Sequence, residues 1–298
     1  MNVVINSRKR IDKPQDTLRK RQVLFSGEPF HEFLQLPGKY LRPCLNELPT
    51  DENKQKRADA TYYGEIDGKL TIFNPEDESQ KVGQDELFQS YDYNTILKKG
   101  FKEIDVYSVI TTQQPLSKCI KAISVDYNLI YSPDIKSYVT NYDGDKILSR
   151  MTKQISDYGN IISDVDAIKI IMLPFMFQNN QDKVLEKSCV LLKEAKLENE
   201  EFRNELILQK QCVIHKFAKT FEDIERLEDV IGLKLAGSNL EYPDNWYVDA
   251  LFSSGRVKGR VEGSLEMAVR FKEVLGIDEV VRISGFSREE IERFNNSK

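Results

Sequence analysis

Alternating apolar and polar positions in the first half of the chain predict a mixed α/β fold. Two β-prone runs, residues 58–63 and 69–74, flank the turn-forming sequence Glu-Ile-Asp-Gly and predict a β-hairpin. Residues 84–100 carry apolar side chains at helical spacing and end in glycine, which predicts a helix. Residues 104–112 are a strongly β-prone run, as expected of a buried strand. The expected order is therefore strand, strand, helix, strand.

Helical spacing dominates from about residue 149 to residue 237. Successive segments there carry apolar residues three and four positions apart, and Asp164 or Asp166 is expected to cap one of the helices. Residues 30–45 have helix-like spacing too, although prolines and a glycine interrupt it. Residues 122–131 suggest one further strand. The chain is thus predicted to be α/β, followed by a helical C-terminal region.

The length of 298 residues exceeds that of a typical single domain, so we expect two domains or one domain with a long extension. The expected division is a basic N-terminal arm (1–22), an α/β domain (23–148), a helical subdomain (149–237) and a linker with a helical tail (238–298). Forty per cent apolar and 31% charged residues indicate a soluble globular protein with a substantial core.

Charge is unevenly distributed, which a net charge of −5 conceals. The net value gives no global indication of nucleic-acid binding. The N-terminal residues 7–21, however, hold seven basic and two acidic side chains. Two interpretations stay open for this segment: a solvated arm, or an arm that contacts a phosphate backbone.

Several classes of protein are disfavoured by what the sequence lacks. The longest apolar run, residues 167–177, is too short to span a bilayer, and no apolar stretch follows the first basic residues as a secretory signal requires. Two histidines without metal-site spacing disfavour a zinc site. Four cysteines without a CxxC pair are expected to be buried thiols of a reducing, cytoplasmic compartment. These are Cys44, Cys119, Cys189 and Cys212.

The tail has glycines at every fourth position, Gly255, Gly259 and Gly263, which a helix would place on one face. Charged residues between them exclude pairing of membrane helices. A charged, partly frayed helix and a close helix contact in a homo-oligomer both stay open. Residues 280–294 predict two short helices around Gly285, and the second is too short and acidic to favour reading of DNA.

Acidic residues gather on the predicted hairpin. Asp59 lies in its first strand, and Glu76, Asp77 and Glu78 follow the second. Carboxylates suit Mg²⁺, which can polarise a phosphate and lower the pKa of a bound water. If the second strand continues, Glu76 and Glu78 share one face and Asp77 points to the other, although Pro75 argues against continuation. Spacing alone also fits an ordinary acidic loop.

The stretch of residues 56–79, with the helix and strand after it, resembles the Rpn family of recombination-promoting nucleases and putative transposases. This family belongs to the PD-(D/E)XK nuclease superfamily. Arg57-Ala58-Asp59 matches its first motif and Glu76-Asp77-Glu78-Ser79 its second, and the helical second half and the tail also look like the family's long members. The resemblance implies a restriction-endonuclease-like mixed sheet flanked by helices. It also implies a Mg²⁺- or Mn²⁺-dependent DNA endonuclease with Asp59 and Glu76 as metal ligands.

One motif position departs from the family, which usually has Gln where this chain has Glu78, and from the superfamily, which has Lys. A shift of two residues gives Glu78-Ser79-Gln80 and restores the Gln, but it moves the acid past the strand end. Either Glu78 or Gln80 would then complete the catalytic set. Two alternatives to an active endonuclease stay open. One is a catalytically inactive nuclease-like module that binds DNA or protein, and the other is a globular protein in which Asp59 forms a salt bridge.

Overall fold

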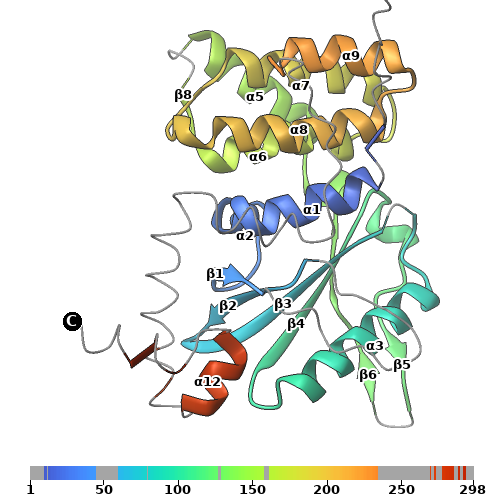
Figure 1. The fold of residues 1–298 in the computed structure, drawn as a ribbon. Coiled ribbons are helices and arrows are strands. Elements are labelled where there is room, and N and C mark those ends of the chain that lie inside the picture. Colours follow the sequence, from blue (N-terminus) through green and yellow to red (C-terminus); the bar gives the residue numbers. More distant parts are fainter. Residues whose placement is uncertain are drawn as a thin grey trace, which may run out of the picture.

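A five-stranded mixed sheet flanked by helices forms the lower half of the molecule in the view of Figure 1. The computed structural model of the chain describes residues 10–11, 13–44, 60–78, 80–126, 129–157 and 161–233, with residues 269, 272, 277–284, 288 and 291–292 of the tail. The sheet has the order β1-β2-β3-β4-β7, antiparallel from β1 to β3 and parallel from β3 to β7. Its strands are β1 (Lys39–Pro43), β2 (Tyr62–Ile66), β3 (Lys69–Glu78), β4 (Asp105–Thr112) and β7 (Asp134–Ser137).

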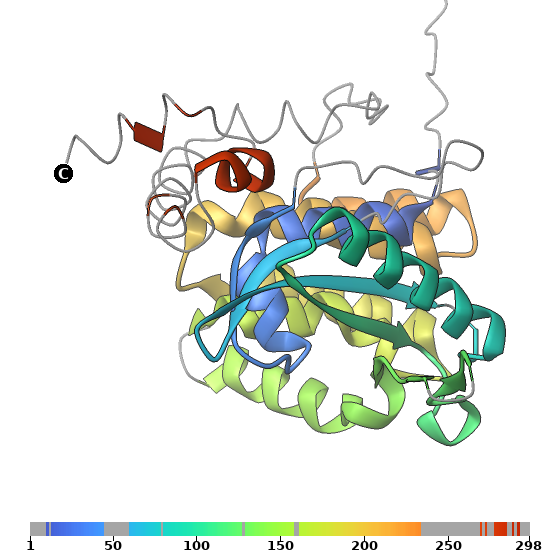
Figure 2. The same cartoon turned by 90° about the horizontal axis from the view of Figure 1, so that it is seen from below.

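Helices cover both faces of this sheet. Helix α3 (Gln84–Gly100) lies on one face (Figure 2), and α1 (Pro14–Phe25) and α2 (Gly27–Phe33) lie between the other face and the remaining large helices (Figure 1). Those helices are α5 (Gly144–Asp157), α6 (Asp164–Met172), α7 (Gln181–Glu194), α8 (Arg203–Phe217) and α9 (Phe221–Val230). The predictions of a helix over 84–100, of a strand near 104–112 and of a helical second half are confirmed.

Shorter elements connect these parts. They are η1 (Leu116–Lys118), β5 (Ile123–Ser124), β6 (Ile130–Tyr131), α4 (Tyr138–Asn141), β8 (Ile161–Ile162), η2 (Leu173–Met176), β9 (Lys196–Leu197), η3 (Glu200–Phe202) and α12 (Ile277–Ser284). The single strand expected over residues 122–131 is wrong, because β5 and β6 form a small antiparallel pair there. The expected Asp cap is wrong too: Ser163 caps α6, and its Oγ accepts the Asp166 N–H at 3.2 Å.

The β2–β3 hairpin turns at Asp67 and Gly68, which both have positive φ (50° and 77°). This is the type I′ geometry that Asp-Gly favours, because its twist matches that of the strands. The expected first strand is displaced toward the turn, and β3 runs four residues further than expected, through Pro75. Pro75 follows Phe73, the last residue of β3 paired with β2, so on that side the proline stands where the pairing has ended.

The helix-like spacing of residues 30–45 misled the prediction, because the segment ends α2 at Phe33 and then forms β1. Gly38, with φ of 78°, makes the turn between them. A Cβ at this position would lie 1.9 Å from the main-chain oxygen of Glu65, so only glycine lets β1 approach β2 here.

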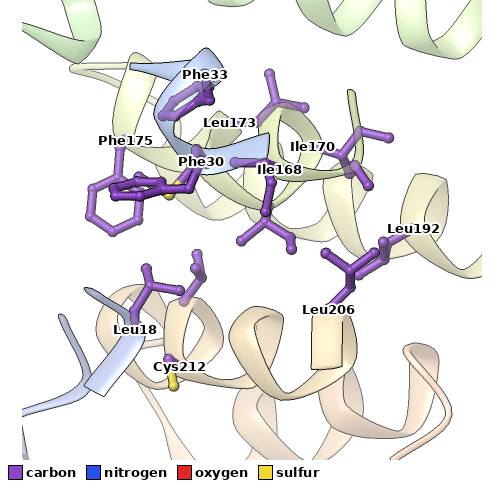
Figure 3. Packing of buried hydrophobic residues seen from close by; sticks show 14 of the residues in the cluster. Leu18, Phe30, Phe33, Ile168, Ile170, Leu173, Phe175, Leu192, Leu206 and Cys212 are labelled. Carbon is purple, nitrogen blue, oxygen red and sulfur yellow. The ribbon is translucent and has the colours of Figure 1, made fainter. Parts of the chain in front are cut away.

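One hydrophobic core joins the sheet to the helical second half. It contains Phe73 of the sheet. Figure 3 shows Leu18 and Phe30 of α1 and α2 in the same core, with Ile168 and Cys212 of α6 and α8. The shared core crosses the expected boundary at residue 148. Whether the α/β and helical parts are separate folding units stays a prediction.

Part of the expected N-terminal arm is a buried helix. Residues 14–22 belong to α1, in which Arg19 and Arg21 are only 3% and 4% exposed. The interpretation as a solvated arm is therefore wrong for this half of the segment. Further upstream, the guanidinium of Arg10 donates to the main-chain oxygens of His215 and Ala218, at the negative end of the α8 dipole.

The expected burial of the four thiols is confirmed for three of them. Cys119 is partly exposed. All four are free. Across the described residues, no helix combines the length and the apolar character that crossing a bilayer requires. The glycines of the tail lie outside the described residues, so an oligomer contact through the C-terminal helix stays a prediction.

Candidate functional site

Strand β3 presents its two faces to different helices. Ile72 packs with Leu97 and Phe101 on the α3 side, whereas the ring of Phe73 lies 5.0 Å from that of His31 in α2. Because the strand continues to Glu78, residues 76 and 78 face α3 and residue 77 faces α1. The alternation expected from the sequence is therefore present, and the candidate acids of β3 lie together on the α3 face.

Glu76 lies half-buried in a polar part of the interface between the sheet and α3. Asn74 Nδ2 donates to Glu76 Oε1 at 3.0 Å, and the Ser90 hydroxyl of α3 also donates to this carboxylate. Ser90 Oγ in turn lies 2.9 Å from the phenol oxygen of Tyr131. Burial raises the pKa of Glu76 to about 7, the charge of Glu78 adds to the rise, and the hydrogen bonds from Ser90 and Asn74 oppose it. Glu76 is therefore poised to exchange a proton near neutral pH.

Glu78 lies among further acids. Burial raises its pKa, and the charges of Glu86 on α3 and of Asp77 raise it further. Glu86 itself accepts the N–H of Gly83 at 2.8 Å and so closes the first turn of α3. A divalent cation would relieve this concentration of negative charge, and carboxylate oxygens are ligands that Mg²⁺ prefers.

The other two candidate site residues, Gln80 and Asp59, are not seen beside Glu76 and Glu78 in the described part of the structure. Gln80 is exposed, and its main-chain oxygen accepts from Thr112 Oγ1 at 2.8 Å, which ties the segment after β3 to the end of β4. Asp59 lies outside the described residues. Within the described ranges, no group of three or more His, Cys, Asp or Glu side chains could hold a metal ion. The structure thus brings Glu76 and Glu78 to one face, and the place of Asp59 beside them stays a prediction.

Asp77 points the other way, into a buried network. Arg19 Nη2 lies 2.8 Å from Asp77 Oδ2, 2.9 Å from Thr111 Oγ1 and 2.7 Å from the phenol oxygen of Tyr138. Thr111 Oγ1 donates to Asp77 Oδ1 at 2.6 Å. The middle acid of the cluster is therefore neutralised from the face opposite to Glu76.

Sequence reasoning missed the polar partners of the acids. Asn74 could have been found, because it lies two residues before Glu76 and must share its face. Ser90 stands on the buried stripe of α3 with Leu87 and Leu97, and a polar residue in such a stripe is an indication of an internal contact. Nothing in the local pattern distinguishes Tyr131.

The raised pKa of Glu76 makes a testable prediction for stability. Between about pH 4.5 and 7 the folded state binds more protons than the unfolded state, so this residue lowers stability as pH rises. We expect Glu76→Gln to raise the free energy of unfolding by about 2 kcal/mol near pH 8, after allowance for partial exposure, and to change it little near pH 5. Urea unfolding at both pH values measures this. Glu103→Gln, at an exposed carboxylate, is the control, and an equal gain at both pH values would contradict the assignment.

Comparison with known proteins adds no relative to this picture. No protein-family model, no curated protein and no solved structure matches the chain.

Proposed function

We propose that the chain is a metal-dependent DNA endonuclease with a restriction-endonuclease-like core. In this proposal Asp59 and Glu76 bind Mg²⁺ or Mn²⁺, and Glu78 or Gln80 completes the catalytic set. One observation carries it: Glu76 and Glu78 share one face at the carboxyl end of β3, in surroundings that disfavour their charge. A bound cation stabilises such groups in the ionised form, and carboxylates with raised pKa values cluster at functional sites, although structural networks raise them too.

The topology supports the proposed core. An antiparallel hairpin, β2–β3, carries the acids at the end of its second strand, and α3 then connects β3 to the parallel strand β4. This is the order of elements that the resemblance to recombination-promoting nucleases implies.

The hairpin register supports the choice of Asp59. Tyr62 pairs with Phe73, and this is the pair of the ladder farthest from the turn. Asp59 stands three residues before Tyr62, and Glu76 stands three residues after Phe73. If that register were extended, Asp59 and Glu76 would stand opposite each other, and opposed residues of two antiparallel strands are close enough to share a ligand; the ladder itself ends at Tyr62 and Phe73.

The chemistry of the site follows from its protonation. A bound Mg²⁺ would polarise the phosphodiester and lower the pKa of a water. Glu76 must lose its proton before it can hold a cation, and Asn74 and Ser90 orient its carboxylate for that role. With a pKa of about 7, protons compete with the metal at neutral pH, so affinity for the cation is expected to rise as the pH increases through this range.

Nicking of supercoiled plasmid tests the proposal. We expect cleavage that needs Mg²⁺ or Mn²⁺ and that falls by about 10²–10³-fold in Asp59→Ala and in Glu76→Gln, as when a group that stabilises charge at a reacting centre is removed. Glu103→Gln should cleave like the wild type. Because Glu76→Gln is expected to be the more stable protein, unfolding cannot explain its loss of activity. Cleavage that survives both substitutions would refute the assignment.

Metal-dependent stabilisation gives a second measurement. Mn²⁺ should raise the melting temperature of the wild type but not of Glu76→Gln, because a ligand that binds only the folded state stabilises it by mass action.

A second candidate function is an inactive nuclease-like module, which is favoured by the acid Glu78 at a position where the family has a hydrogen-bond donor. Salt-dependent DNA binding without cleavage in either metal would support that alternative.

A further inference from the structure

The ion pair between Arg19 and Asp77 lies directly behind the acidic site. Arg19 belongs to α1 and stands 58 residues before Asp77 in the sequence. The guanidinium of Arg19 also lies 4.7 Å from the ring centre of Phe30. Burial lowers the pKa of Arg19, but Asp77 and Tyr138 more than offset this, so the side chain is charged. A full positive charge is thus buried against the middle residue of three consecutive acids.

Stability alone is a poor explanation for this arrangement. Arg19 Nε and Nη1 are buried and have no hydrogen-bond partner among the described residues. Unsatisfied donors and a buried charge are costly, and apolar side chains of similar volume often serve the fold as well as a buried ion pair. The pair therefore calls for a role that an apolar pair could not fill.

That role follows from what the network holds. Thr111 Oγ1 of β4 lies 2.6 Å from Asp77 Oδ1 and 3.1 Å from the main-chain oxygen of Glu76. Together with Arg19, it fixes both the side chain of Asp77 and the peptide before it. Since neighbouring residues of a strand alternate in direction, fixing Asp77 on one face fixes Glu76 and Glu78 on the other.

We propose that Arg19 is a positioning residue for the acidic site, and that it acts through Asp77 to hold Glu76 and Glu78 in one orientation at the end of β3. This inference rests on the proposed function for its catalytic consequence. The holding of the strand end itself does not depend on the identity of the reaction.

A double substitution separates positioning from stability. Arg19→Met with Asp77→Leu replaces the ion pair by apolar side chains and leaves no buried charge unpaired, so the urea midpoint should stay close to that of the wild type. Tyr138→Phe is the matched control, because it removes one oxygen partner of Arg19 but keeps the contact with Asp77. That control should lose stability and keep the site.

Three measurements on the full chain decide the inference. In the double variant we expect Mn²⁺ binding and nicking to weaken by about 10–100-fold, the usual loss when a supporting contact of a metal ligand is removed. Hydrogen exchange of the amides of residues 76–78 should accelerate by about 10-fold at unchanged global stability. Tyr138→Phe should bind Mn²⁺ like the wild type, whereas Glu76→Gln should not bind it.

Each outcome has one meaning. A double variant with wild-type amide exchange and wild-type Mn²⁺ affinity overturns the positioning role. If the wild type and Glu76→Gln both fail to bind Mn²⁺ and to nick DNA, the proposed function fails instead. The exchange rates then decide alone whether Arg19 holds the strand end.

Discussion

Replacing Lys210 by methionine is expected to raise the free energy of unfolding near pH 7 by about 3 kcal/mol. Lys210 is fully buried in α8, and its Nζ contacts two uncharged oxygens of the described residues, Ser188 Oγ at 2.5 Å and the main-chain oxygen of Ile171 at 3.5 Å. Burial lowers its pKa to about 8, and Cys189 opposes this only in part. The folded state therefore holds a proton less tightly than the unfolded state does. Methionine fills a similar volume without that cost.

The pH dependence gives the sign of this effect. In the unfolded chain the lysine has a pKa near 10.5, so between about pH 8 and 10.5 the unfolded state binds more protons and wild-type stability rises with pH. The advantage of the methionine variant should therefore shrink across this window. Urea unfolding of both proteins near pH 7 and pH 10 measures the difference. Lys193→Met, on the exposed side of α7, should change stability by less than about 0.5 kcal/mol. A less stable Lys210→Met protein near pH 7 would contradict the argument.

The opposite result is expected for Arg21, because its charge is paired. Arg21→Met should lower the free energy of unfolding by about 3–5 kcal/mol, since it leaves Glu205 buried without its cation. The two side chains are 5% and 11% exposed and form a two-pronged contact, Nε to Oε1 at 2.9 Å and Nη2 to Oε2 at 2.5 Å. This contact joins α1 to α8.

Thermal and urea unfolding test this prediction against a double variant. Arg21→Met with Glu205→Met removes both charges and should recover most of the loss, to within about 2 kcal/mol of the wild type. Lys20→Met is the control, because its pair with Asp16 is a partly exposed contact within α1 and its loss should cost less than about 0.5 kcal/mol. A single variant that loses less than about 1 kcal/mol would show that the buried pair is not the connection between the helices.

The sequence was most informative where a local pattern determines the structure. The helix α3 followed from its periodicity and the strand β4 from its continuous β-prone run. The common face of Glu76 and Glu78 followed from the two-residue repeat of a strand, on the condition that the strand continued past Pro75. Strand β1 did not follow, because its apolar residues have helix-like spacing. What makes it a strand is the close approach to Glu65 that Gly38 permits, and this contact is not local.

The surroundings of the candidate site could not be predicted for the same reason. Ser90 and Tyr131 meet across 41 residues, and Arg19 meets Asp77 across 58. The basic composition of the N-terminal segment suggested a solvent-exposed arm rather than a buried helix. A count of charges does not distinguish exposed arginines from buried ones. Only the tertiary fold decides that Arg19, a residue of α1, is buried against the end of the sheet.

The central position of α1 has a consequence for the order of events during synthesis. Arg21 leaves the ribosome 184 residues before Glu205, its partner on α8. At about 5–20 residues per second, the interval is roughly 10–40 seconds, far longer than a helix needs to form. For that time α1 carries a buried-type surface and a cation whose partner on α8 is not yet translated. Helix α1 is thus made well before the helix that completes its environment.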